Sequence, residues 1–72
     1  MSETTQVSIT ANGTAHSIDE GLPLTEFIQQ RGLQPNRVVV EYNRNALNPS
    51  EIEGIHLTSG DTLEIVRIVA GG

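Results

Sequence analysis

The sequence predicts an α+β fold in which a mixed sheet of four to five strands carries one α-helix on one face. Strand-like segments lie on both sides of a single helical segment, and a long strand-like run, residues 62–69, closes the chain. A length of 72 residues corresponds to one small domain. We therefore expect a mobile polar tail at residues 1–6, a folded domain at residues 7–69 and a flexible C-terminal tail at residues 70–72.

The N-terminal part of the domain is predicted to be a β-hairpin. Apolar and polar residues alternate over residues 7–11, which is typical of a half-buried strand. Asn12-Gly13 follows, a pair that suits the positive φ angles of a two-residue hairpin turn. Residues 14–18 form the expected return strand.

The helical segment is expected to open at residues 22–24, with Pro23 in its first turn. Leu24, Phe27 and Ile28 recur at the spacing of one helix face, which predicts that this face packs on the sheet. Gly32 is placed just beyond the helix end, so the helix is expected to be only about two to three turns long.

The second half of the domain is predicted to hold another pair of strands. Residues 37–42 are strand-like, residues 43–45 suit a tight turn, and residues 46–47 form a short return strand. Ser50 is expected to cap one helical turn that runs through residue 53.

The last strand, residues 62–69, is expected at the centre of the sheet beside the first strand, because it would make a poor exposed edge. This order of elements is the β-grasp arrangement. Alternation along the strands assigns one set of side chains to the helix and another to the outer face. The inward set is Val38, Val40, Tyr42, Leu63 and Ile65, and the outward set is Val39, Glu41, Glu64 and Val66.

Composition excludes several classes of function. The formal net charge is −5 and all four basic residues are arginine, so the chain has no footprint for nucleic acid or an anionic membrane and suits a partner with a basic docking surface. Cysteine is absent, which excludes thiolate chemistry, and no apolar run is long enough to span a bilayer. The polar N-terminus lacks the features of a signal peptide, so we expect a cytoplasmic location.

The sequence does not predict an enzyme. His16 and His56 are isolated, with no second histidine at metal-ligand spacing, and we expect both to be structural or surface residues. The carboxylates near the helix start favour the helix dipole, and no glycine-rich phosphate loop follows a strand. No set of side chains therefore supports catalysis or a metal site.

The C-terminal end, Val69-Ala70-Gly71-Gly72, is the most informative feature. An apolar strand leads into it without a polar spacer, and its small residues Ala70 and Gly71 allow the tail to thread a narrow channel in a partner. The α-carboxylate of Gly72 is ionised at neutral pH and becomes an acyl donor only after activation, as in an acyl-adenylate. The chain has no lysine, so chains linked through its own lysines are excluded.

These features together resemble the ubiquitin-like sulfur carriers, in particular the ThiS-type carriers of thiamine biosynthesis. The resemblance runs from Val7 to the C-terminus and is most specific at the last two of its motifs. The motifs are the Asn12-Gly13 hairpin, the Leu24/Phe27/Ile28 helix, the valine strand entering Asn43, Pro49-Ser50, Gly60-Asp61 and Val69-Ala70-Gly71-Gly72. The chain departs from the family at Asn43-Arg44, where Asn-Gly is common, and in lacking an aromatic residue near Ile52.

The resemblance implies a ubiquitin-like β-grasp carrier that is monomeric on its own, binds no cofactor and is not itself an enzyme. A ThiF-type adenylating enzyme would use ATP to adenylate the Gly72 carboxylate, and a sulfur donor would convert it to a thiocarboxylate. A ThiG-type thiazole synthase would then receive the sulfur. Within the same fold, a molybdopterin-synthase small subunit or a tRNA-thiolation modifier remains an alternative.

We expect Val39, Val66 and Ile68 to contact the activating enzyme, with Glu41 and Glu64 at the rim. The competing interpretation is that these are ordinary exposed apolar residues on a sheet face, which are common. A further alternative is a β-grasp protein-binding module that is not a carrier and in which the two terminal glycines have no role.

Overall fold

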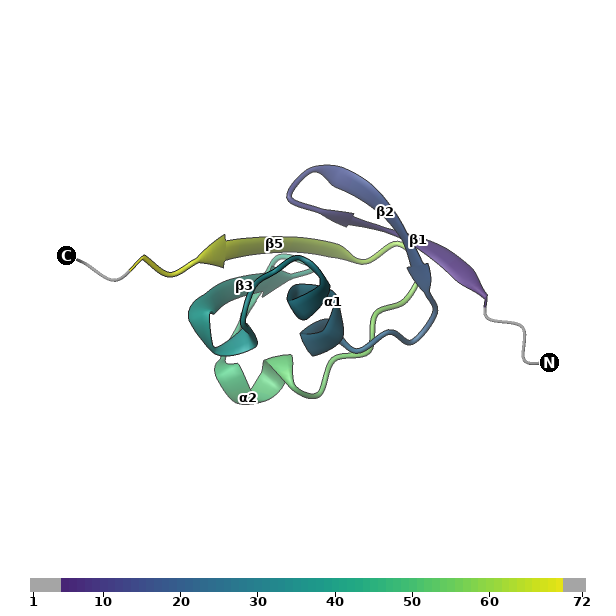
Figure 1. The fold of residues 1–72 in the computed structure, drawn as a ribbon. Coiled ribbons are helices and arrows are strands. Elements are labelled where there is room, and N and C mark those ends of the chain that lie inside the picture. The colour runs from purple at the N-terminus through teal and green to yellow at the C-terminus, as the bar shows by residue number, and fades with distance from the viewer. Residues whose placement is uncertain (1–4, 70–72) are drawn as a thin grey trace.

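The computed structural model describes residues 5–69, which form a five-stranded mixed sheet with α1 on one face (Figure 1). The strand order is β2-β1-β5-β3-β4, with β5 parallel to β1 and antiparallel to β3. The β-grasp prediction is therefore confirmed, including the central place of the last strand. The elements are β1 (Gln6–Ala11), β2 (Thr14–Asp19), α1 (Leu24–Gln30), η1 (Pro35–Arg37), β3 (Val38–Tyr42), β4 (Asn45–Leu47), α2 (Pro49–Ile52) and β5 (Thr62–Arg67).

The structure starts the first strand at Gln6, one residue earlier than expected. Most of the expected N-terminal tail and all of the expected C-terminal tail, residues 1–4 and 70–72, lie outside the described residues. Within the described part of the chain, neither helix is long and apolar enough to cross a membrane.

The turn of the first hairpin also ties β1 to β5. Asn12 and Gly13 have φ angles of 50° and 80°, as a two-residue turn of this kind requires. The Asn12 side chain donates from Nδ2 to the Ile65 carbonyl oxygen at 3.1 Å and accepts at Oδ1 from the Ile65 amide at 2.7 Å. Since backbone pairing between β1 and β5 covers only two residue pairs, this side chain extends the contact beyond the end of β1.

Helix α1 supplies the centre of the core. Leu24, Phe27 and Ile28 are fully buried against the sheet, as their spacing predicts. The helix begins at Leu24, and Pro23 stands just before it in an extended conformation rather than inside the first turn. The Leu24 amide donates to the Ile55 carbonyl oxygen at 3.0 Å, so a loop satisfies a helix-end donor that lacks a side-chain cap.

The cap of α2 differs from the expectation. Asn48, not Ser50, is the N-cap: its Oδ1 accepts from the Glu51 amide at 2.9 Å, and the Glu51 side chain accepts from the Asn48 amide at 2.8 Å. Pro49 explains the difference, because proline suits the first helical position and holds the preceding residue extended. The short helix η1 before β3 was not predicted either.

Strand β5 ends at Arg67, two residues before the expected end at Val69. Its last sheet partner is Val38, the first residue of β3, so beyond Arg67 no strand remains opposite. One further bond follows, from the Ile68 amide to the Arg37 carbonyl oxygen at 2.9 Å. Val69 is 81% exposed, so the chain leaves the sheet here.

A buried carboxylate holds the start of β5. Asp61 is 6% exposed and accepts hydrogen bonds from the Tyr42 hydroxyl at 3.0 Å, the Asn43 side-chain amide at 3.1 Å and the Thr58 backbone amide at 2.9 Å. The Asn43 Oδ1 in turn accepts from the Thr62 amide at 2.9 Å. The turn after β3 is thus joined to the loop before β5, which sets the register between the two strands.

Tyr42 makes this network sensitive to alkaline pH. Burial raises the pKa of the Tyr42 phenol above its ordinary value of 10.0, and the hydrogen bond to Asp61 and the charge of that carboxylate raise it further. The unfolded chain therefore loses the phenolic proton at a lower pH than the folded chain does.

We expect the contribution of Tyr42 to stability to be complete below about pH 10 and to be lost as the pH rises through the higher pKa of the folded state. Urea denaturation of the wild type and of Tyr42→Phe from about pH 9 to 12 measures this, since the variant lacks the phenol. The stability of the wild type should fall more steeply with pH than that of the variant. Parallel curves would contradict the assignment.

Candidate functional site

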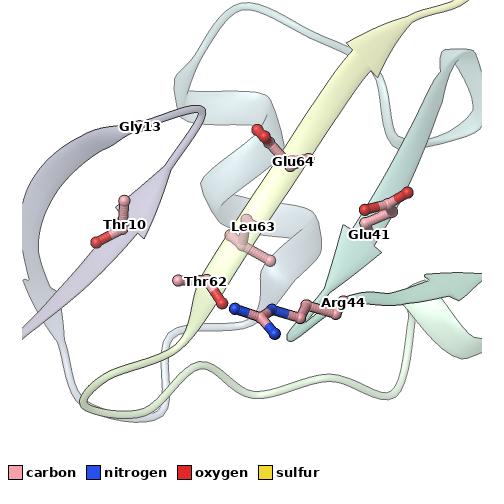
Figure 2. Close-up of a pocket in the computed structure, with 7 residues that line it drawn as sticks. All are labelled: Thr10, Gly13, Glu41, Arg44, Thr62, Leu63 and Glu64. Carbon is pink, nitrogen blue, oxygen red and sulfur yellow. The ribbon is translucent and has the colours of Figure 1, made fainter.

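The register between β3 and β5 builds the exposed face of the sheet. Val39 lies directly opposite Val66, and Glu41 lies directly opposite Glu64. The two valines are 50% and 61% exposed, whereas the inward residues on both strands are buried or half-buried, so the predicted assignment of faces is confirmed. Figure 2 shows Glu41 and Glu64 projecting from neighbouring strands on the side away from α1.

Two adjacent hollows lie along this face, and both are lined by Glu41 and Glu64. One, of about 380 Å³, extends toward Thr10 and Arg44 (Figure 2). The other, of about 390 Å³, extends toward Val39 and Val66. We call the two together the outer groove. It combines an apolar floor at one end with a polar and charged end at the other, which is typical of a protein-docking surface.

Arg44 is a groove residue that sequence reasoning did not identify as one. It occupies the β3–β4 turn with a φ of 71°, and Asn43 before it has a φ of 48°. A left-handed conformation costs a residue with a Cβ about 1–2 kcal/mol relative to glycine. The arginine side chain extends from the turn toward Thr62 (Figure 2), so it brings a positive charge to an otherwise acidic hollow.

The pair formed by Glu41 and Glu64 is unfavourable for folding. Like charges directly opposite on an antiparallel pair repel each other, and both side chains are exposed on the same face. A basic group of a partner placed between them would relieve this repulsion, so the pair suits a partner with a basic surface.

The remaining expected site residues lie at the end of β5. Ile68 is 53% exposed, but it lines a cleft beside the segment between α1 and β3 rather than the outer groove. Val69 is exposed beside it. Ala70, Gly71 and Gly72 lie outside the described residues.

The two histidines take part in structural contacts. The His16 ring packs edge-on against Phe27, with centroids 5.5 Å apart, and its Nδ1 lies 3.4 Å from an Arg31 guanidinium nitrogen. His56 forms a backbone bridge with Pro23 in the loop before α1. Among residues 5–69, no three acidic or histidine side chains gather in a way that could hold a metal ion.

The β-grasp sheet, with Gly71-Gly72 following its central strand in the sequence, places the chain in the class of ubiquitin-like proteins. The sequence matches the model of the ThiS family over residues 4–72, and the chain belongs to this family. Among curated proteins, no sequence matches it.

A solved structure is similar to the whole domain. It is the crystal structure of the thiamine biosynthesis protein ThiS from Geobacter metallireducens. The two proteins share 28% sequence identity with a TM-score of 0.75, and the match covers 92% of this chain and 100% of the other.

Replacing one acid of the groove should stabilise the domain. Glu64→Gln should raise the free energy of unfolding at low ionic strength by about 0.2–1 kcal/mol, because it removes the repulsion across the strands. In a Glu41→Gln background the same change should have little effect, which urea denaturation of the four proteins measures as a double-mutant cycle. An equal gain in both backgrounds would show that Glu41 is not the cause.

Proposed function

We propose that this protein is a sulfur carrier of thiamine biosynthesis and that the carboxylate of Gly72 carries the sulfur. The observation that carries the proposal is the short distance in sequence between the central strand β5, which ends at Arg67, and the Gly71-Gly72 pair. Membership of the ThiS family supports thiazole formation as the destination, rather than molybdopterin synthesis or tRNA thiolation.

The chemistry takes place in two steps on partner enzymes. In the first, a Gly72 carboxylate oxygen attacks the α-phosphorus of ATP on a ThiF-type enzyme, pyrophosphate leaves, and a mixed anhydride with AMP forms. In the second, hydrosulfide attacks the carbonyl carbon, AMP leaves with the bonding electron pair, and a thiocarboxylate remains. That thiocarboxylate then delivers sulfide to a ThiG-type thiazole synthase.

The composition of the chain suits this role. Ala70 and Gly71 have little or no side chain, so a narrow channel that excludes water from the mixed anhydride can still admit the tail. Cysteine is not needed, since the sulfur is attached to the terminal carbonyl carbon. With no lysine present, the activated carbonyl meets no ε-amine of its own chain.

The outer groove is proposed as the docking surface for the adenylating enzyme. Val39 and Val66 form an exposed apolar pair, and Glu41 and Glu64 continue the surface along the same two strands. An apolar contact with an acidic rim complements a partner with a basic rim and accelerates the encounter at low ionic strength. Because Val66 is on β5, this surface begins only a few residues before the tail.

Removal of Gly72 tests the carrier proposal. After incubation with the adenylating enzyme, ATP and sulfide, the intact mass of the wild type should rise by the difference between a sulfur and an oxygen atom. The chain that lacks Gly72 should show no such gain, although its fold is unchanged. If the wild type gains no mass with an enzyme that is competent on another carrier, the proposed function is wrong.

Val66→Asp tests the docking surface. This change should abolish adenylation, because it puts a charge into the apolar contact, and should leave the domain folded, because Val66 is 61% exposed. Ser59→Asp, which adds the same charge in the exposed turn before β5, is the matched control and should be adenylated normally. Pyrophosphate release and circular dichroism measure the two effects. Normal adenylation of Val66→Asp would exclude the outer groove.

A further inference from the structure

A second concave surface lies at the base of the tail, on the side of the sheet that carries α1. Its volume is about 210 Å³, and it is lined by residues of the segment between α1 and β3 and by the end of β5. Arg37 and Arg67 contribute its two charged side chains, and Leu33 and Ile68 contribute apolar surface. We call it the tail-base cleft.

The charge of this cleft is opposite to that of the protein as a whole. The chain has a net charge of −5, yet no residue that lines the tail-base cleft is acidic. A neighbouring hollow, which shares Leu33, is lined by Arg31 and His16 and likewise by no acidic residue. Three of the four arginines therefore lie on the helix side near the end of β5, whereas Arg44 lies in the outer groove with Glu41 and Glu64.

A partner protein that encloses the tail also covers the tail-base cleft. The Ile68 amide is bonded to the Arg37 carbonyl oxygen, so the last described residues run along the rim of the cleft. A protein that encloses the chain beyond Val69 has to approach this rim. Covering Arg37 and Arg67 removes water from two guanidinium groups, which is costly unless the partner pairs them with carboxylates. Arginine favours carboxylate in particular, because its planar fork donates two parallel hydrogen bonds to the two carboxylate oxygens.

We propose that the tail-base cleft binds a carboxylate-bearing segment of the adenylating enzyme, with Arg37 and Arg67 as its recognition residues. This inference rests on the proposed function, since it takes the enclosing protein to be that enzyme. The enzyme then contacts β5 on both faces: a basic surface lies on the outer groove, and an acidic segment lies in the cleft. Opposite charges on the two sides specify how the carrier is oriented when its tail enters the active site.

Single glutamine substitutions test the proposal. Arg37→Gln and Arg67→Gln each change the net charge from −5 to −6, and Ser59→Asp makes the same change at the other end of β5. All three positions are exposed, and the bond from the Ile68 amide uses only the backbone of Arg37, so each variant should fold. Circular dichroism and urea denaturation check this before binding is measured.

Binding to the adenylating enzyme is measured by titration calorimetry, first without nucleotide and then with ATP, at low and at moderate ionic strength. Each arginine variant should bind about tenfold more weakly than Ser59→Asp at low salt, and its affinity should depend less on salt than that of the wild type. Arg37→Lys should restore only part of the loss, because lysine keeps the charge and lacks the fork.

The outcomes separate this inference from the proposed function. If the wild type is bound and adenylated and both arginine variants match Ser59→Asp, the tail-base cleft is not a recognition site and only this inference is overturned. If the arginine variants lose affinity only when ATP is present, the cleft binds a phosphate group, and the acidic segment is likewise excluded. If the wild type itself is neither bound nor adenylated, the proposed carrier function is wrong, and the inference about the cleft falls with it.

Discussion

The position of β5 between β1 and β3 is the constraint on which the rest of the structure depends. This strand pairs with one hairpin on each side, so both halves of the chain meet on it. Two asparagine side chains reinforce the contact: Asn12 bonds the backbone of Ile65, and Asn43 bonds that of Thr62. With the strand held from both sides, the chain leaves the sheet at the end of β5, just after Arg67. The proposed function, in which the tail enters the active site of another protein, needs such a fixed origin.

The same register also creates the exposed surface, and it does so at some expense of stability. It places Glu41 against Glu64, a like-charge pair that opposes folding of an isolated domain, and it leaves Val39 and Val66 exposed to water. Arg44 adds a left-handed arginine in the adjoining turn. The like-charge pair and the left-handed arginine lie on one face, next to the strand that bears the tail, which supports the proposal that this face is a docking surface. The opposite face, under α1, has the well-packed core that compensates for them.

Acidic and basic side chains lie on different sides of β5, although the net charge of the chain is −5. The outer groove has acidic side chains on two adjacent strands, whereas the tail-base cleft has Arg37 and Arg67 and no acid. A partner that encloses the tail meets both signs, one on each side of the strand. Complementary charges of this kind reject wrong orientations as well as wrong partners. Under the proposed function, the same terminal carboxylate is presented to two different enzymes, and control of its orientation would serve both.

Local chemistry in the sequence was sufficient for the strands, for α1 and for the faces of both, but not for η1. Alternation in the strands separates inward from outward residues, the spacing of Leu24, Phe27 and Ile28 places the helix face, and Asn12-Gly13 defines a turn, because each depends on neighbours along the chain. The Asn48 cap could have been predicted as well, since Pro49 after it is a local signal. The terminal Gly-Gly and the absence of lysine and cysteine are likewise properties of the sequence.

Only the tertiary structure decided that Glu41 faces Glu64, that Asp61 is buried under Tyr42 and that Arg37 and Arg67 share a cleft. These pairs are far apart in sequence, and they meet through a strand register that arises when the whole sheet assembles.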